Sequence, residues 1–512
     1  MKKLNDLKIK LPVGTGGFLI FTLALAVAFS LLPHEFLDPG SKKFIFVLGV
    51  LAMWRYSWGL LHFVRSIIYR KIVFPRWRKT ADENSDALMP SHIYLMITAF
   101  RIAANTTMKV YEATIREAIA CGAPATIVAS IVELSDEFMI KEQFRAANPP
   151  DHVRLMIVRI PGTGKRDGLA QGFRAISRDM PAPDAVVAVI DGDSILGENL
   201  IRKCSTFFKL RPNLGALTTD EDCIVEGSKL FKEWYSMRFA QRQIQMCSVA
   251  LSGRVMTLTG RMSMFRASIV THPDFISHVE SDYLDHWRLG RFKFLTGDDK
   301  SSLFSVLKAG YETLYIPDVV VYTVEHPPGD NFIQGTTQLM FRWFGNMLRT
   351  NSRVLALGPT QMPLFVWWCF VDQRISMWTA LSGPTFAILL SLKYGVVFIP
   401  IYLVWVGFTR WIMAMMLLSS RPVLSWYYPF LIYYNQIWGS CIKTYVMFRL
   451  DRQSWTRQKT KLNRGLTAGQ EAWVRFTSFA CHATSVLVFV TIIGLISGFF
   501  TFPTDLLGTI FG

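Results

Sequence analysis

The stretch DAVVAVIDGDS, residues 184–194, carries a short apolar run that ends in two aspartates, Asp191 and Asp193. A nearly continuous apolar run of this length is typical of a strand in a sheet that helices cover on both faces. Three more short apolar runs precede this one, namely IYLMITAF at 93–100, TIVASIVEL at 126–134 and VRLMIVRI at 153–160. Segments with the periodicity of a helix, at 110–122 and 168–179, lie between these runs. The sequence therefore predicts an α/β domain with a mostly parallel sheet, whose ligands bind beyond the carboxyl ends of the strands.

The composition of the whole chain indicates a membrane protein. Of the 512 residues, 51% are hydrophobic, and the mean hydropathy is +0.27. Apolar runs that approach the roughly 20 residues needed to span a bilayer begin at Gly17 and Phe44, and further runs occupy about 376–393, 395–419 and 477–500. No small-x-small cleavage site follows the first run, which disfavours a cleaved signal peptide. The aromatic segment 425–449 is expected to be interfacial or re-entrant, with a sixth span as the alternative.

Basic residues predict the orientation of the chain. Six of them follow the second apolar run, namely Arg65, Arg70, Lys71, Arg76, Arg78 and Lys79. By the positive-inside rule, the amino terminus and the α/β domain lie on the cytoplasmic side of the membrane. Basic flanks against anionic lipid also explain the formal charge of +17 without nucleic acid. We expect two amino-terminal membrane helices in 1–80, a cytoplasmic domain with an amphipathic interfacial helix near its end in 81–358, and a membrane channel in 359–512.

Asp191 and Asp193 are candidates for a metal site. They flank Gly192 at the predicted tip of a buried strand. Hard carboxylate oxygens suit Mg²⁺ or Mn²⁺ held against a diphosphate. A polar turn at the end of the strand is the alternative.

Two earlier stretches are candidates for binding a nucleotide. PGTGKRDGLAQGFRAI, residues 161–176, is a glycine-rich turn that leads into a helix, where backbone N–H groups together with Lys165 and Arg166 favour an anion. It lacks the spacing of a P-loop, and a solvated cap is the alternative. In VELSDEF, residues 132–138, Asp136 can accept hydrogen bonds from a nucleotide, although an ordinary helix start explains the stretch equally well.

The stretch FKFLTGDDKSS, residues 292–302, offers a general base. Asp298 and Asp299 lie side by side before Lys300. One of the two carboxylates can deprotonate an incoming hydroxyl. The alternative is a plain helix start, with Thr296 as the N-cap and both aspartates facing the helix dipole.

Arg342 and Trp343 lie in the amphipathic segment TTQLMFRWFGNMLR, residues 336–349. Arginine binds a leaving phosphate in bidentate fashion, and tryptophan stacks on a sugar or base. An anchor at the membrane interface is the alternative.

The order of these motifs resembles the processive family-2 glycosyltransferases, which include cellulose and hyaluronan synthases. The motifs are KRDG, DGDS, TGRMSMFR, TGDDKSS and FRW, and they precede membrane helices. The resemblance implies a GT-A fold and an inverting transfer from a nucleotide sugar. It implies that Asp191 contacts the donor, Asp193 holds Mg²⁺ or Mn²⁺, and Asp299 is the base that Asp298 supports. Lys165, Arg166, Lys300, Arg342, Trp343 and Asp136 would complete the donor site.

The family motif Q-x-x-R-W fits imperfectly. Leu339 occupies the Gln position, and Gln338 lies one residue early. Further stretches, among them ITAFRI and DQRISMWT, are similar to the catalytic subunits of alginate synthases along nearly the whole chain. That similarity implies polymerisation of GDP-mannuronate into a β-1,4 chain, coupled export, and a membrane partner that senses cyclic-di-GMP.

Several alternatives remain open. A UDP-sugar-dependent polymerase of neutral glucan or of a hyaluronan-like chain shares the same motifs. A non-processive lipid glycosyltransferase would release a single-sugar product. In a non-enzymatic alternative, the α/β domain regulates a transporter.

Arg410 lies within a predicted carboxyl-terminal span, where an unpaired charge is costly. A polyuronate carries one carboxylate per sugar, so a cationic residue would help it to cross. We therefore expect Arg410 to line an export path, with snorkelling towards the interface as the alternative.

Overall fold

The computed structural model describes residues 12–36, 38, 49–225, 227–329, 331–455, 460–462 and 464–500. The chain divides into two compact units. The sheet unit comprises His62–Asp372 and Leu450–Gly465, and the helical unit comprises Met1–Leu61, Gln373–Arg449 and Leu466–Gly512. Residues 44–48 of the predicted second span lie outside the described residues.

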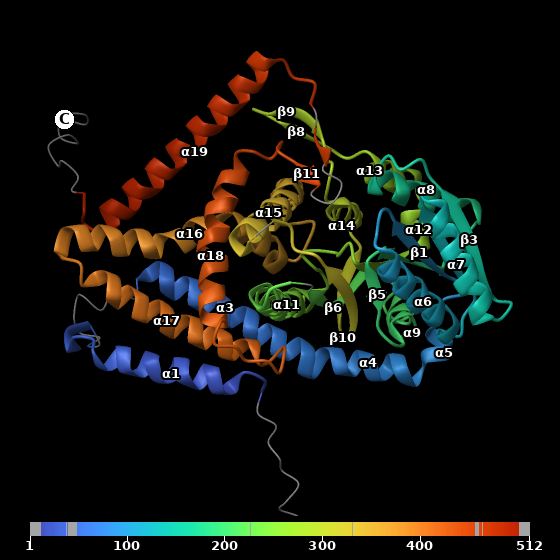
Figure 1. Ribbon diagram of the computed structural model, residues 1–512, viewed down its shortest axis with the longest axis horizontal. Coiled ribbons are helices and arrows are strands. Elements are labelled where there is room, and N and C mark those ends of the chain that lie inside the picture. The colour runs from blue at the N-terminus through green and yellow to red at the C-terminus, as the bar shows by residue number, and fades with distance from the viewer. Residues whose placement is uncertain are drawn as a thin grey trace, which may run out of the picture. The chain divides into compact units, whose positions relative to one another are not determined.

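A mixed eight-stranded sheet forms the centre of the sheet unit (Figure 1). The strand order is β3-β2-β1-β4-β7-β6-β10-β5. The run from β3 to β4 is parallel, as are β6 and β10, whereas β7 is antiparallel to both neighbours and β5 is antiparallel to β10. The strands are β1 Ile93–Ala99, β2 Ala125–Ile131, β3 Val153–Arg159, β4 Val186–Asp191, β5 Ser194–Leu196, β6 Leu214–Val225, β7 Met262–Arg266 and β10 Glu312–Glu325. The four apolar runs in the sequence are β1 to β4, which confirms the predicted α/β domain.

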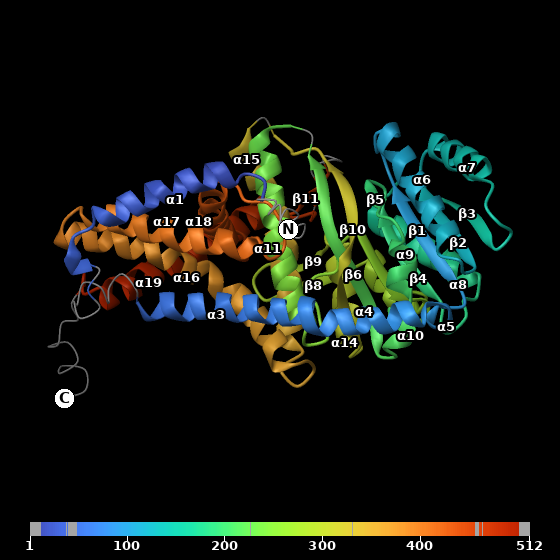
Figure 2. The same cartoon turned by 90° about the horizontal axis from the view of Figure 1, so that it is seen from below.

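Helices cover both faces of this sheet (Figure 2). α6, α7 and α9 contact one face, α8 and α12 contact the other, and α13 packs on α8 and α12. The apolar pattern explains this arrangement, because every residue of β1 and β2 is buried. The helices are α4 Phe74–Glu83, α5 Ser85–Leu88, α6 Ala104–Ala120, α7 Leu134–Ala147, α8 Lys165–Arg178, α9 Leu200–Ser205, α10 Phe207–Leu210, α11 Lys229–Ala250, α12 Ala267–Val270, α13 Pro273–Glu280, α14 Asp298–Lys308 and α15 Phe332–Ala356.

The carboxyl ends of four central strands lie at one edge of the sheet. β7 is antiparallel to both β4 and β6, so those two strands are parallel to each other and to β1 and β10. β4 ends at Asp191, and β10 ends at Glu325. Two hairpins accompany the sheet, β8 Tyr283–His286 with β9 Gly290–Lys293, and β11 Ser454–Trp455 with β12 Thr460–Lys461. The polar ends of the central strands therefore gather where an α/β sheet binds its ligands.

The helical unit contains long apolar helices. Among the described residues, three helices are long and apolar enough to cross a membrane, namely α16 Leu364–Tyr394, α17 Phe398–Leu417 and α19 Ala468–Ile496. They correspond to the three carboxyl-terminal runs in the sequence. The first amino-terminal run forms the shorter apolar helix α1 Thr15–Ser30, and the second continues as α3 Val50–Ile68 and a π-helical turn, Tyr69–Val73.

The aromatic segment 425–449 contains a 20-residue helix, α18 Tyr428–Met447. It packs against α17, and Figure 1 shows that it runs steeply across the direction of α17. The interfacial placement of this segment stays a prediction.

Candidate active site

Three elements bring charged side chains together in the sheet unit. α8 begins at Lys165, β4 ends at Asp191, and α14 begins at Asp298. Lys165 Nζ lies 3.0 Å from Asp191 Oδ2 and 3.3 Å from Asp298 Oδ2. A Cβ added at Gly260 would lie 3.3 Å from Lys165 Nζ, so the loop before β7 adjoins the same point. Four motifs that are far apart in the sequence, KRDG, DGDS, TGRMSMFR and TGDDKSS, therefore meet at one place.

Lys165 and Asp298 hold each other in their charged forms. Burial opposes the charge of Lys165, but Asp191 and Asp298 offset that effect, and the pKa of Lys165 is raised. Burial likewise works to raise the pKa of Asp298, but Lys165 and Arg166 outweigh it, and the pKa falls below its ordinary value. Asp298 is therefore an ionised carboxylate at neutral pH.

Asp299 experiences the opposite environment from its neighbour. Burial raises the pKa of Asp299, the charge of Lys300 opposes this rise, and the negative charge of Asp298 adds to it. The net pKa is above the ordinary value of an aspartate. Two adjacent carboxylates whose pKa values move apart are typical of sites in which one accepts a proton and the other stays charged. This arrangement supports the prediction that Asp299 is the base and Asp298 its supporting charge.

The two carboxylates at the end of β4, Asp191 and Asp193, are suitable ligands for a hard divalent cation. Burial raises the pKa of Asp191, Lys165 opposes the rise, and Asp193 adds to it, so the two carboxylates experience each other's charge. Asp193 is only 8% exposed. Within the described ranges, no group of three or more His, Cys, Asp or Glu side chains could hold a metal ion. Mg²⁺ needs no such cage, because it commonly takes one or two carboxylates and completes its shell with substrate phosphates and water.

The start of α14 differs from the sequence prediction. Thr296 was expected to be the N-cap, but Gly297 occupies that position with φ +85°. The hydroxyl of Thr296 instead donates to Asn346 Oδ1 of α15, at 2.7 Å. The prediction was wrong because glycine adopts the left-handed region at little cost, which leaves the threonine hydroxyl to join two helices.

Arg342 and Trp343 lie one helical turn before Asn346 on α15, on the face that reaches the start of α14. Trp343 stacks on Trp234 of α11, with ring centroids 5.8 Å apart and an interplanar angle of 18°. Trp343 therefore lies in an aromatic cluster within the sheet unit, and its contact with a sugar or base stays a prediction.

Arg166 has a positioning role in addition to the donor contact predicted for it. It is 6% exposed and donates to the carbonyl of Val279, to the carbonyl of Thr296 and to the hydroxyl of Ser301. Ser301 and the guanidinium of Arg353 both donate to the buried carboxylate of Asp282. These bonds fix the start of α14 against α8.

A buried ion-pair network at the ends of β6 and β10 was not predicted from the sequence. Glu221 is 1% exposed, and its carboxylate pairs with Arg261 and, at 3.2 Å, with Arg242 of α11. Arg261 also lies 2.6 Å from Glu325. Arg261 belongs to the motif TGRMSMFR, and Glu221 belongs to the acidic run TDED at 219–222, within β6. Both stretches stand out in the sequence, but nothing in it shows that they pair.

Lys300 and Asp136 complete the predicted set. The amine of Lys300 donates to Thr257, and its pKa is lowered by burial, an effect that Asp299 opposes. Asp136 lies in the first turn of α7, where burial and the charge of Glu133 raise its pKa. Lys300 therefore adjoins the predicted base, while contact of Asp136 with a nucleotide stays a prediction.

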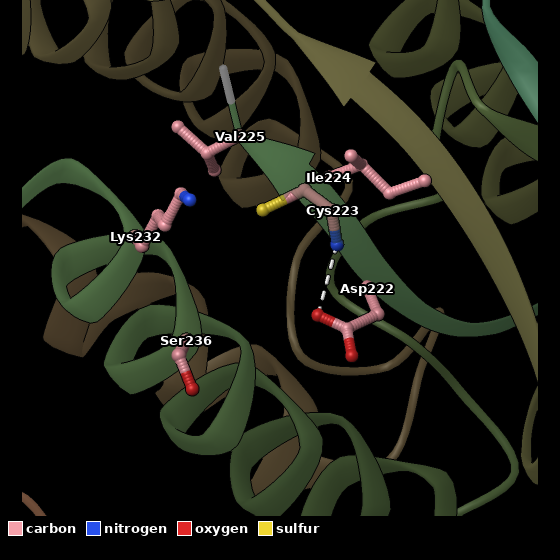
Figure 3. A pocket seen from close by; sticks show the side chains of 6 residues that line it. All are labelled: Asp222, Cys223, Ile224, Val225, Lys232 and Ser236. Atoms are coloured by element: carbon pink, nitrogen blue, oxygen red, sulfur yellow. Dashed lines mark hydrogen bonds between the residues drawn. The ribbon is translucent and has the colours of Figure 1, made fainter. Parts of the chain in front are cut away.

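A cavity of about 330 Å³ lies between the end of β6 and α11. Figure 3 shows Lys232 and Ser236 on the helix opposite Asp222, Cys223, Ile224 and Val225 on the strand. Burial raises the pKa of the Cys223 thiol to about 12. The thiol is therefore protonated at neutral pH, and it supplies no nucleophile here.

The chain is similar to several known proteins. A family described as "Glycosyltransferase like family 2" matches residues 90–346. A protein named Glycosyltransferase alg8 from Pseudomonas syringae pv. tomato is 51% identical over 93% of this chain and 97% of its own length. A second protein of that name, from Azotobacter vinelandii, is 49% identical over 96% of this chain and 100% of its own length. A solved mannosyltransferase from Pyrobaculum calidifontis, in complex with GDP-Man and Mn²⁺, aligns with 75% of this chain and 98% of its own at 12% identity and a TM-score of 0.41.

Proposed function

Because this chain belongs to the family-2 glycosyltransferases, we propose that it polymerises mannuronate from GDP-mannuronate into β-1,4-linked polymannuronate, the precursor of alginate. The observation that carries the reaction is the position of Lys165 between Asp191 and Asp298, with Asp299 beside them. The donor is supported by the similarity to alginate synthases along nearly the whole chain. The neutral-glucan, hyaluronan-like and lipid-product alternatives share the motifs but lack the support of that similarity.

The reaction begins when Asp299 takes the proton from the hydroxyl at the nonreducing end of the growing chain. The oxygen then attacks the anomeric carbon of the donor, and the bond from that carbon to the diphosphate breaks with inversion. The proton passes from Asp299 to water before the next cycle. General base catalysis of this kind contributes about 10²- to 10⁴-fold to the rate.

Cationic groups stabilise the departing GDP. Lys165 is held by two carboxylates, so its charge is fixed in place before the leaving group develops its own. Arg342 approaches from α15, one turn before the contact with α14. Asp191 and Asp193 would hold Mg²⁺ or Mn²⁺, which supplies further positive charge to the diphosphate.

The export half of the proposal concerns the helical unit. Arg410 of α17 is 6% exposed, and it donates to Thr409 at 2.8 Å and to Gln436 of α18. Its guanidinium also lies 5.6 Å from the ring centroid of Tyr433. Arg410 is therefore buried among polar groups of two helices and does not extend to an interface, which supports an export path over snorkelling.

The setting of the enzyme follows from the same proposal. We place the sheet unit on the cytoplasmic side of the bacterial inner membrane, on the evidence of the basic residues after the second apolar run. The proposal includes a cyclic-di-GMP-sensing membrane partner, supported by the resemblance alone.

Polymer formation from labelled GDP-mannuronate in native membranes tests the function. The control is Asp299→Asn, and UDP-glucose and GDP-mannose serve as competing donors. Polymer from GDP-mannuronate alone, lost in the variant, is the expected result. Polymer from UDP-glucose would overturn the donor but keep the chemistry, and full activity of Asp299→Asn would remove Asp299 from the reaction.

A further inference from the structure

Arg238 of α11 lies over two stacked tryptophans. Its Cζ is 4.1 Å from the ring centroid of Trp343 and 4.7 Å from that of Trp234. Trp234 precedes Arg238 by one helical turn, so α11 presents the ring and the guanidinium on one face. A guanidinium this close to two aromatic rings is held by cation–π attraction, which restricts its movement.

The charge of Arg238 has no anionic neighbour in the part of the chain that the structure describes. Its Nη1 is buried and has no hydrogen-bond partner there. Burial lowers the pKa of Arg238 to about 10, and the groups that modify this effect are Tyr235 and Arg261, neither of which is a carboxylate. By contrast, Arg242 and Arg261 nearby are paired with Glu221. A cationic side chain with a buried, unmet N–H donor and no carboxylate partner can receive an anion from a ligand.

The position of Arg238 relates it to the acceptor chain. Trp343, which the resemblance places at the donor site, lies one turn before Asn346 on α15, so an acceptor sugar next to the donor would lie close to it. Asn346 accepts from Thr296, three residues before Asp299. A sugar that presents its hydroxyl to Asp299 and extends along α15 would pass Trp343, and its carboxylate would be within the range of a guanidinium stacked on that ring.

We propose that Arg238 binds the carboxylate of the acceptor uronate next to Trp343 and thereby selects a charged chain over a neutral one. The inference rests on the proposed function, because only a polyuronate carries a carboxylate on every sugar. It assigns to Arg238 a role in acceptor recognition and none in donor binding or proton transfer. A charge-assisted, bidentate contact with the carboxylate accounts for the selectivity.

The test compares two ligands on the full chain reconstituted in nanodiscs. One is a fluorescent hexamannuronate, and the other is the same oligomer with its carboxylates converted to methyl esters. The wild type is expected to bind the acid about 10- to 100-fold more tightly than the ester. Arg238→Gln should bind the acid no more tightly than the ester, while its affinity for the ester stays unchanged. Arg238→Lys keeps the charge without the planar fork and should retain part of the preference.

Two controls separate this role from a structural one. Lys109→Gln removes an exposed positive charge from α6 of the same unit and should leave the preference for the acid intact. Affinity for GDP-mannuronate, measured on every variant, reports whether the donor site is still folded. It should be equal in the wild type and in Arg238→Gln.

Several outcomes would overturn the inference. They are equal loss of acid and ester binding in Arg238→Gln, an unchanged preference for the acid, a fall in affinity for GDP-mannuronate, and absence of any preference in the wild type. The wild type could instead bind the acid more tightly than the ester, with the preference lost in Arg238→Gln, and yet make no polymer from GDP-mannuronate. That result would overturn the proposed donor but support the role of Arg238 in binding the acceptor.

Discussion

Replacing Lys165 by methionine should destabilise the sheet unit more than any substitution of an exposed charge on the same helix. Lys165 is 13% exposed, and its partner Asp298 is 14% exposed. At 3.0 and 3.3 Å, each ion pair has a Coulomb energy of about 5 kcal/mol at an effective dielectric constant of about 20. Desolvation offsets much of that energy. Removing one member of a buried pair nevertheless costs about 3–5 kcal/mol, because Asp191 and Asp298 both lose the cation in contact with them.

A second ion pair on α8 provides the matched control. Arg174 and Glu280 lie 2.6 Å apart, but their side chains are 33% and 31% exposed. Water screens such a pair, so Arg174→Met should cost only about 0–1 kcal/mol. Both variants exchange a cationic side chain for methionine on one helix, and they differ mainly in the burial of the charges left behind.

Thermal unfolding of the full chain in nanodiscs measures the difference. A thiol-reactive fluorophore reports unfolding of the sheet unit, because Cys121, Cys204 and Cys247 are buried free thiols within it. With EDTA present, Lys165→Met should unfold roughly 6–20 °C below the wild type, at about 2–4 °C per kcal/mol. Arg174→Met should shift the midpoint by less than roughly 4 °C. Equal shifts in the two variants, or no shift in Lys165→Met, would refute the argument that Lys165 is the charge that holds these carboxylates together.

Four further predictions concern pH, metal, packing and export. Because the pKa of Asp299 is raised, activity should fall on acidification at a higher pH than an ordinary aspartate would give. In pH–rate profiles this fall should move to higher pH in Lys300→Met and to lower pH in Asp298→Asn, because Lys300 lowers the pKa of Asp299 and Asp298 raises it. A shift in the same direction in both variants would contradict the role of Asp299 as the base. Chelation of divalent cations should abolish polymer formation, and Mg²⁺ or Mn²⁺ should restore it in a radiolabel assay, whereas activity that persists in chelator would exclude the role proposed for Asp191 and Asp193. Arg353→Gln leaves Asp282 buried without its ion-pair partner and should cost about 3–5 kcal/mol in the thiol-reactive unfolding assay, so a wild-type midpoint would count against a structural role. Arg410→Gln should reduce exported polymer in cells at normal protein level, while polymer synthesis in open membranes stays unchanged, and normal export would remove Arg410 from the path.

The motifs of the site could be predicted from the sequence because each one lies where a local pattern changes. Asp191 and Asp193 end an apolar strand, Lys165 follows a glycine-rich turn, and Asp298 and Asp299 follow the run that ends in Phe294. Their convergence was implied by the resemblance and by the rule that ligands bind at strand ends. The structure confirms the strands and helices and brings Lys165, Asp191 and Asp298 into contact.

Other parts of the site could not be read in this way. The pairing of Glu221 with Arg261 and Arg242 joins β6, the loop before β7, and α11, and no spacing in the sequence relates them. The alternative interpretation of residues 292–302 made Thr296 the N-cap of α14, because threonine is common at that position. In the structure Gly297 is the N-cap, and the hydroxyl of Thr296 bonds to Asn346 of α15. In each case a contact from a distant element outweighed the local preference.

The sequence by itself determined the alternation of strands and helices, the apolar helices and the family of the chain. Burial on a strand or helix repeats every few residues, so a local pattern is enough to encode it. Only the tertiary structure decided that adjacent aspartates, Asp298 and Asp299, have pKa values displaced in opposite directions, and that Arg238 stacks on Trp343. The reason is that electrostatic energy depends on which charges and how much water lie within a few ångströms of a group, and those neighbours come from distant parts of the chain.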